Sequence, residues 1–337
     1  MSTRTSITDN LHARGGNDFD AVTLRDAIAE LDDLQTLESA ALSDYRLFYS
    51  LEFPRTSHQH SLYCVSCPGA AAGTGTAADE RLVVQHFVPE DSHSHVLLCH
   101  GYYDHVGLYG HVIDYLLHRG VAVVTFDQIG HGLSSGAPAY IDNFDRYVAA
   151  THSVYCTAHE RLASTEAWHW FGQSMGGSIV MEYLHHHPPP QGVCEIVLLA
   201  PLVRPYAWWI NRWIFALVKL TVEQRPRRLA NNAENPEFHA LQEIDPLQAR
   251  VLPVAWVQAM VDWYHRFERY PISELAPKVL QGDDDHTVDW RYNLKVFQRR
   301  YPNARHLRIA NGRHHLANDS AVVRETMWTF LDDTCQW

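Results

Sequence analysis

Two patterns of apolar residues alternate along most of the chain. One consists of short apolar runs, which are typical of buried strands. The other places apolar residues three or four positions apart, as on one face of a helix, with Val112, Ile113 and Leu116 as an example. The strand-like runs occupy residues 95–99, 121–126, 167–171, 194–199, 278–281 and 305–309. This alternation predicts an α/β fold whose mostly parallel sheet is covered by helices on both faces.

One connection is far longer than the others. Residues 201–275 separate two strand-like runs, whereas a crossover between parallel strands needs little more than one helix. We therefore predict a helical cap at 201–275, inserted between two parts of the core at 21–200 and 276–337. Residues 1–20 are polar and are expected to form a flexible tail. The apolar spacing from Val22 to Leu42 predicts one amphipathic helix.

Composition excludes several classes of function. The chain has 27 Lys and Arg against 39 Asp and Glu, and its net charge of -12 gives no positive field for nucleic acid. No apolar run approaches the roughly 20 residues of a membrane span, and no secretory leader is apparent, so we expect a cytoplasmic protein. The 23 histidines lack carboxylate or thiol neighbours at ligand spacing, and neither a metal nor a cofactor is expected.

The strongest chemical motif is a GxSxG sequence between a strand and a helix. Gly172, Ser174 and Gly176 follow the run AWHWF and precede a helical stretch. A turn this sharp strains the serine backbone, and side chains two positions away would collide, which glycine avoids. The following helix directs its N-terminal amides at the same point, where negative charge develops when a carbonyl is attacked. The motif predicts a nucleophilic serine at a strand-to-helix turn.

A serine nucleophile needs an imidazole base and a carboxylate that orients it. Candidates for both follow the last two strand-like runs, at the strand ends where active sites of parallel sheets collect. The carboxylates are Asp283, Asp284, Asp285 and Asp289, and the imidazoles are His314 and His315.

The order of these motifs resembles the α/β-hydrolase superfamily, and within it the monoacylglycerol lipase and lysophospholipase group. The resemblance covers residues 81–333 and is carried by His100-Gly101, the run FDQIGHGLSSG at 126–136, the Ser174 turn, a GxxD at 282–285 and a GxxH at 312–315.

This resemblance implies an α/β-hydrolase fold with an inserted helical cap, and it assigns roles by motif position. Ser174 would be the nucleophile, Asp285 the carboxylate and His315 the base, with His314 as the alternative base. The backbone N–H groups of Tyr102 and Met175 would form the oxyanion hole. Asp283, Asp284 and Asp289 remain alternatives to Asp285.

The expected reaction is two-step acyl transfer from a carboxylic ester through an acyl-enzyme. A helix rich in Trp208, Trp209 and Trp213 lies in the cap region and could line an apolar channel, which favours a long-chain monoacylglycerol or lysophospholipid. The same tryptophans could contact the inner membrane surface peripherally. A short-chain carboxylesterase, a serine peptidase, an acyltransferase and a non-catalytic binding protein remain alternatives, and the sequence leaves the oligomeric state open.

Overall fold

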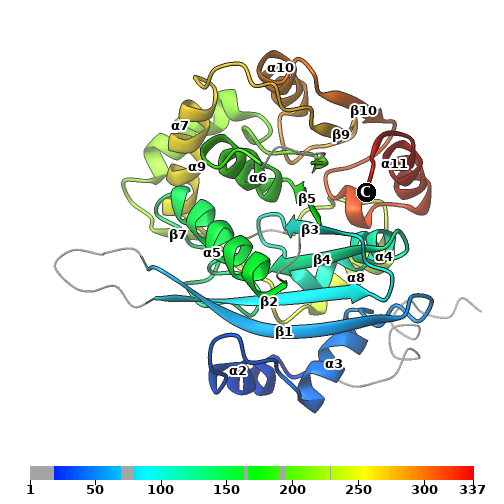
Figure 1. Ribbon diagram of the computed structural model, residues 1–337. Helices are drawn as coiled ribbons and strands as arrows, with labels where there is room; N and C mark the ends of the chain where they lie inside the picture. The colour runs from blue at the N-terminus through cyan, green and yellow to red at the C-terminus, as the bar shows by residue number, and fades with distance from the viewer. Residues whose placement is uncertain (1–18, 70–78, 163–165, 190–193, 228) are drawn as a thin grey trace, which may run out of the picture.

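Eight strands of the described residues form one sheet, which runs through the middle of the molecule (Figure 1). The structure is a computed structural model that describes residues 19–69, 79–162, 166–189, 194–227 and 229–337. The strand order is β1-β2-β4-β3-β5-β6-β9-β10. The strands are β1 (His58–Cys67), β2 (Glu80–Pro89), β3 (Ser94–Cys99), β4 (Val121–Phe126), β5 (Ala167–Gln173), β6 (Ile196–Leu199), β9 (Lys278–Gly282) and β10 (Arg305–Ile309).

Most of the sheet is parallel, as the alternating pattern predicts. β1 pairs antiparallel with β2 and β2 antiparallel with β4, whereas the pairs from β4 through β3, β5, β6 and β9 to β10 are parallel. The sequence of β3 is apolar because both faces of this strand are buried: Val96 and Leu98 face one core, while Leu97 and Cys99 face the other. Parallel strands therefore end at one edge, where β5, β9 and β10 place their following loops.

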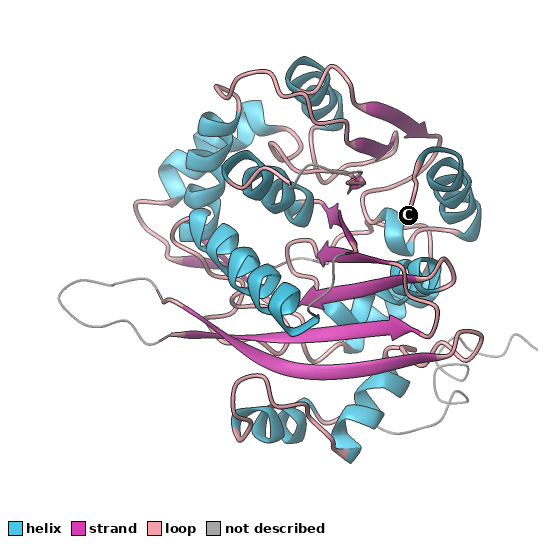
Figure 2. Cartoon of the chain, viewed as in Figure 1, coloured by secondary structure: helices cyan, strands magenta, loops and turns pink. Residues whose placement is uncertain are grey.

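Helices cover both faces of the sheet (Figure 2). One core contains side chains of α5, α6, α9 and α10, and the other contains those of α2, α3, α4, α8 and α11. These helices are α2 (Ala21–Ala29), α3 (Ala40–Phe48), α4 (Gly110–Leu117), α5 (Asp145–Leu162), α6 (Met175–His186), α8 (Pro236–Ile244), α9 (Val254–Phe267), α10 (Trp290–Arg300) and α11 (Ala321–Thr334). The predicted doubly covered α/β sheet is confirmed.

The prediction of one helix from Val22 to Leu42 is wrong. Two helices, α2 and α3, occupy this region, and the chain between them places Leu34 at φ 68°, which no continuing helix allows. Ser39 then caps α3 by accepting the Leu42 N–H. The predicted tail at 1–20 lies outside the described residues except for its end, where Phe19 is buried against Tyr45.

The segment between β6 and β9 leaves the sheet. It contains α7 (Trp208–Val218), α8, α9 and two short strands, β7 (Gln224–Pro226) and β8 (Val251–Pro253), which pair only with each other among the described residues. The pattern of the sequence did not predict these two strands. That residues 201–275 form a separate cap remains a prediction. The helices α7 and α9 of this segment lie over the face of the sheet that α5 and α6 cover (Figure 1).

A buried carboxylate joins α9 to α6. Glu182 is fully buried, and it accepts hydrogen bonds from Trp263 Nε1 at 2.9 Å, Tyr270 Oη at 2.8 Å and Arg266 at 2.8 Å. A buried charge is tolerated only when its lone pairs are satisfied in this way. Because α6 begins directly after Ser174, this contact fixes α9 relative to the helix that carries the predicted nucleophile.

Candidate active site

Ser174 lies at the sharp turn between β5 and α6. Its backbone adopts φ 52° and ψ -117°, a conformation that costs a non-glycine residue free energy and that marks functional turns. A Cβ at Gly172 would lie 2.6 Å from the Gly176 carbonyl, and one at Gly176 would collide with the carbonyl oxygen of Cys99 on β3. The two glycines therefore permit the close backbone approach that presents the Ser174 hydroxyl, as their spacing predicts.

A histidine and an aspartate form a line of hydrogen bonds with this hydroxyl. His314 Nε2 lies 2.9 Å from Ser174 Oγ, and His314 Nδ1 lies 2.8 Å from Asp285 Oδ2. A carboxylate only accepts, so Nδ1 donates to Asp285, and Nε2 of the neutral ring accepts from Ser174. These are the contacts a serine needs to lose its proton during attack on a carbonyl.

The expectation that His315 contacts Ser174 is wrong. His315 Nε2 lies 3.2 Å from Asp104 Oδ2, and its ring packs 4.6 Å from the ring of Phe238 on α8. The reason is local: adjacent residues point their side chains in different directions, and ahead of a short 3₁₀ turn (η2, Leu316–Asn318) only the ring of His314 is directed at Ser174. Of the two histidines, the structure brings His314 to Ser174 and Asp285.

Groups of β9 and of its own loop hold the Asp285 carboxylate in place. Asp285 Oδ1 accepts the N–H groups of Thr287 at 2.8 Å and Val288 at 3.1 Å, and Gln281 Nε2 donates to Oδ2 at 2.9 Å. Asp283 and Asp284 lie in the same loop, but their carboxylates pair with Arg308 and with His286 and Arg313. Asp289 instead caps α10 and pairs with Arg204.

Sequence reasoning missed a role for Gln173, the residue before the serine. Its Nε2 donates to the His314 carbonyl at 3.2 Å, and its Oε1 accepts the Ala317 N–H at 3.3 Å. Gln173 thus fastens the histidine loop to the end of β5. Its place beside Ser174 was the only signal in the sequence.

Burial and charge act in opposite directions on these groups. Burial lowers the pKa of His314, but attraction and a hydrogen bond from Asp285 outweigh it, and the pKa lies above its usual 6.5. Burial likewise raises the pKa of Asp285, but His314 and several N–H donors outweigh it, and the pKa lies below its usual value. The pair therefore favours an ionised carboxylate beside an imidazole that holds its proton more tightly than a free histidine does.

The two predicted oxyanion donors lie beside Ser174. Met175 is the first residue of α6, and the first N–H groups of a helix have no partner within the helix. Tyr102 follows Gly101, where an added Cβ would lie 3.5 Å from Ser174 Cβ. The Tyr102 ring stacks on Trp256 of α9 with centroids 3.6 Å apart, and its hydroxyl donates to the Ala139 carbonyl at 2.9 Å.

The three tryptophans predicted to bind substrate have different environments. Trp208 is buried and its Nε1 donates to Tyr264 of α9 at 3.3 Å, whereas Trp209 and Trp213 are 67% and 66% exposed. The prediction that all three tryptophans line a substrate channel therefore does not fit Trp209 and Trp213, whose side chains are exposed. No helix within the described part of the chain combines the length and apolar character that crossing a bilayer requires.

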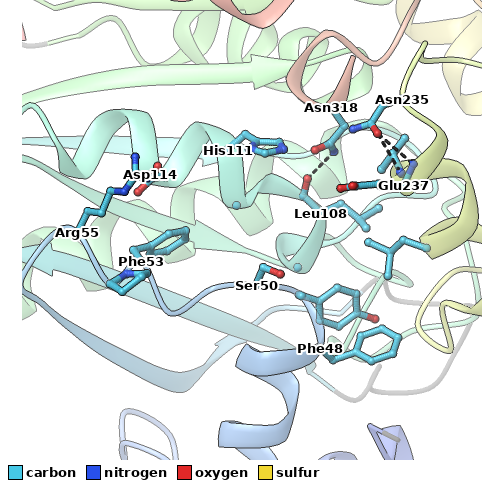
Figure 3. Close-up of a pocket in the computed structure, with 16 residues that line it drawn as sticks. Phe48, Ser50, Phe53, Arg55, Leu108, His111, Asp114, Asn235, Glu237 and Asn318 are labelled. Atoms are coloured by element: carbon cyan, nitrogen blue, oxygen red, sulfur yellow. Dashed lines mark hydrogen bonds between the residues drawn. The ribbon is translucent and has the colours of Figure 1, made fainter. Parts of the chain in front are cut away.

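A hollow of about 330 Å³ lies away from Ser174, between α3, α4 and α8 (Figure 3). Phe48, Leu108 and Phe238 supply apolar walls, and the side chain of Asn318 donates to the Leu108 carbonyl at its edge. Among the described residues, no group of three or more His, Cys, Asp or Glu is placed to hold a metal ion.

The mostly parallel sheet, covered by helices on both faces, and the strand-to-helix turn at Ser174 together define an α/β-hydrolase. The chain belongs to the Hydrolase_4 family, described as serine aminopeptidase, S33, which matches residues 90–321. The predicted resemblance to α/β-hydrolases of the monoacylglycerol lipase group is confirmed, and family and relatives indicate a hydrolase.

Similar proteins include several named monoacylglycerol lipases. The monoacylglycerol lipase of Mycolicibacterium smegmatis is 24% identical over 269 residues, which cover 76% of this chain and 92% of the relative. A monoglyceride lipase variant from Saccharomyces cerevisiae, solved with a substrate analogue, superposes with a TM-score of 0.66 at 16% identity, over 80% of this chain and 98% of that one. The enzyme from Paleococcus ferrophilus gives 0.59 at 19% identity, over 71% and 92%. These structural similarities concern the fold.

The two adjacent histidines predict different losses of activity. His314→Gln should lower kcat for ester hydrolysis by about 10⁶, as removal of a catalytic base typically does. His315→Gln should lower kcat by no more than about 10², because His315 does not contact Ser174. Initial rates on a soluble ester, with thermal melting as a check of folding, measure both. The reverse order of losses would contradict the geometry.

The raised pKa of His314 sets the pH dependence. The base must be neutral, so kcat/KM should fall as pH drops through an apparent pKa above 6.5. Asp285→Asn removes the negative charge that raises the pKa of His314 and leaves burial, which lowers it. The apparent pKa should therefore decrease, and kcat should fall by about 10⁴. Asp283→Asn, in the same loop, is the control and should change neither. An acidic limb that stays in place in Asp285→Asn would contradict the assignment of the carboxylate.

Proposed function

We propose that this protein hydrolyses carboxylic esters through an acyl-enzyme formed on Ser174. The observation that carries the proposal is the continuous line from Ser174 Oγ through His314 to Asp285, with distances of 2.9 and 2.8 Å. Side chains of these three types in this order activate a hydroxyl in unrelated folds.

In the first half of the reaction, Ser174 Oγ attacks the ester carbonyl carbon and its proton passes to His314 Nε2. Asp285 stabilises the resulting imidazolium through Nδ1–H. The negative oxygen of the tetrahedral intermediate is directed at the N–H groups of Tyr102 and Met175. When the intermediate collapses, the alcohol leaves with the proton from Nε2.

Water completes the cycle by the same route. It gives a proton to His314 Nε2, attacks the acyl-enzyme and releases the carboxylic acid, while the proton returns to Ser174. All of these steps use groups of this chain and require no cofactor.

The substrate class we propose is a long-chain monoacyl ester, a monoacylglycerol or a lysophospholipid. The named monoacylglycerol lipases among the relatives support a lipid ester, and the stacked rings of Tyr102, which follows Gly101 beside Ser174, and of Trp256 on α9 offer apolar surface. Each buried methylene contributes about 0.8 kcal/mol, so an acyl chain that enters such surroundings is selected by length. The family description also names an aminopeptidase, which makes amide cleavage the second candidate.

A substrate panel separates these candidates. Monoacylglycerols, lysophospholipids, acetyl and butyryl esters and aminoacyl p-nitroanilides are supplied at equal concentration, with Ser174→Ala as the blank. We expect kcat/KM to be highest for a long-chain monoacyl ester and the blank to lose about 10⁶ in rate. A maximum at acetyl esters would indicate a short-chain carboxylesterase, and a maximum at p-nitroanilides a peptidase. A blank as active as the parent would exclude Ser174 as the nucleophile.

We further propose that α7 contacts a lipid surface peripherally. On α7, Trp209, Trp213 and Leu217 recur at helical spacing and are 67%, 66% and 73% exposed, and Leu220, just beyond the end of the helix, is 77% exposed. Exposed apolar residues grouped on one helix face mark an interaction site, and tryptophan is favoured at membrane interfaces. Arg212 and Lys219 lie on the same segment and suit the headgroup region. A substrate held in that surface would then lie close to the cap.

Binding to vesicles tests this contact. Trp209→Ser combined with Trp213→Ser should reduce co-sedimentation with phosphatidylcholine vesicles by at least about 10-fold, because the buried apolar area is lost. Hydrolysis of a short water-soluble ester should not change. Val22→Ser combined with Val322→Ser replaces similarly exposed residues outside the cap and should leave vesicle binding intact. Equal binding by parent and tryptophan variant would contradict the proposal.

A further inference from the structure

A second buried pair of histidine and carboxylate lies beside Ser174 and takes no part in the proton transfer. Asp104 and His315 are 6% and 1% exposed, and Asp104 Oδ2 lies 3.2 Å from His315 Nε2. Asp104 belongs to the loop after β3, three residues beyond Gly101. Removing a carboxylate and a histidine from water costs free energy, which is recovered only through good geometry and further hydrogen bonds to the surroundings.

A chain of hydrogen bonds leads from this pair to the backbone of Gly101. The hydroxyl of Tyr109 accepts the Gly101 N–H at 2.9 Å and donates to Asp104 Oδ2 at 2.8 Å. The same Oδ2 accepts from His315. The peptide plane on the N-terminal side of Gly101 is therefore fixed by the Tyr109 hydroxyl.

The peptide plane on the other side of Gly101 is fixed as well. The Gly101 carbonyl accepts from His100 Nδ1 at 2.8 Å and from the Asp104 N–H at 3.2 Å. A trans peptide is planar, so its N–H points opposite to its carbonyl oxygen. The N–H in this plane belongs to Tyr102, and fixing the carbonyl also fixes the direction of the proposed oxyanion donor.

Space around Gly101 leaves little room for another arrangement. A Cβ at this position would lie 2.7 Å from Asp104 Oδ2 and 3.5 Å from Ser174 Cβ. The loop also contains Tyr103 at φ 71°, a conformation that is costly for a tyrosine and needs support from its surroundings. Asp104 therefore packs closely against Gly101 on the side where a side chain would point.

We propose that Asp104, Tyr109 and His315 are positioning residues, which orient the Tyr102 N–H toward the oxyanion through Gly101. This inference rests on the proposed function of Ser174. Tyr109 acts as the bridge, Asp104 as the acceptor that sets the direction of the Tyr109 hydroxyl, and His315 as the group that keeps Asp104 ionised.

Charges at the pair are consistent with these roles. Burial raises the pKa of Asp104, but His315 and the hydroxyl of Tyr109 outweigh it, and the pKa falls well below its usual value. Burial and the neighbouring carboxylate raise the pKa of Tyr109 well above 10, so its hydroxyl stays a donor. An ionised acceptor and a protonated donor make the hydrogen bond between them a strong, charge-assisted one.

Loss of the orientation of the Tyr102 N–H should weaken stabilisation of the transition state and leave substrate binding unchanged. One oxyanion donor is worth about 10² to 10³ in rate, and a donor that remains present but loses its orientation should lose part of that. Tyr109→Phe should therefore lower kcat by about 10- to 100-fold and change KM by less than about 2-fold. Asp104→Asn and His315→Gln should lower kcat in the same way but by smaller factors.

The test compares a transition-state analogue with a ground-state analogue. A trifluoromethyl ketone that carries the best acyl chain of the panel adds to Ser174 and places a negative oxygen in the oxyanion hole. Its Ki should rise in Tyr109→Phe by the factor by which kcat/KM falls, whereas Ki for the matching non-hydrolysable alkyl ether should stay constant. Rates are divided by active sites counted with a fluorophosphonate, so unfolded protein does not contribute.

Tyr115→Phe is the matched control. Tyr115 is also buried and also donates to a carboxylate, Asp332, at 2.8 Å, but that carboxylate lies on α11 and not in the loop of Gly101 and Asp104. It should leave kcat and both Ki values unchanged. The proposal would be overturned if Tyr109→Phe and His315→Gln kept the kcat and the ketone Ki of the parent. It would also be overturned if Tyr115→Phe lost as much kcat and ketone affinity as Tyr109→Phe. If the parent neither turns over esters nor binds the ketone, the proposed function itself fails.

Discussion

The hydrogen bond between Ser174 and His314 depends on three strand ends meeting at one edge of the sheet. β5 leads to Ser174, β9 to Asp285 and β10 to His314, and the parallel pairing of these strands places all three loops on the same side. The close backbone contacts at Gly172 and Gly176 then bring α6 against β3 and present the hydroxyl. Gln173 ties the loop of His314 to the end of β5, and Gln281 of β9 holds the Asp285 carboxylate.

The same edge brings α9 and the loop after β3 together. Tyr102 contacts Trp256 of α9 on its outer side, and Gly101 is held from within by Tyr109 and His100. Glu182 joins α9 to α6, the helix that begins directly after Ser174. Both proposed oxyanion donors, Tyr102 and Met175, therefore belong to elements that contact α9.

Much of this arrangement could be predicted from sequence, and the exceptions have physical reasons. The strands follow from the apolar runs. The Ser174 turn follows from Gly172 and Gly176, because a side chain at either position would collide with the backbone. Two adjacent histidines defeat such reasoning, because the GxxH spacing selects His315 whereas the folded loop directs the ring of His314 at Ser174. The break at Leu34 was missed since apolar spacing continued across it, and the exposure of Trp209 could not be read from an apolar face alone.

Mapping the site of covalent modification tests the central claim most directly. The protein is treated with a fluorophosphonate, digested and sequenced by mass spectrometry, with His314→Gln and His315→Gln in parallel. The account predicts a single phosphonylated residue, Ser174, in the parent and in His315→Gln, and labelling slowed by orders of magnitude in His314→Gln. Modification at another residue, or unchanged labelling when His314 is replaced, would contradict it.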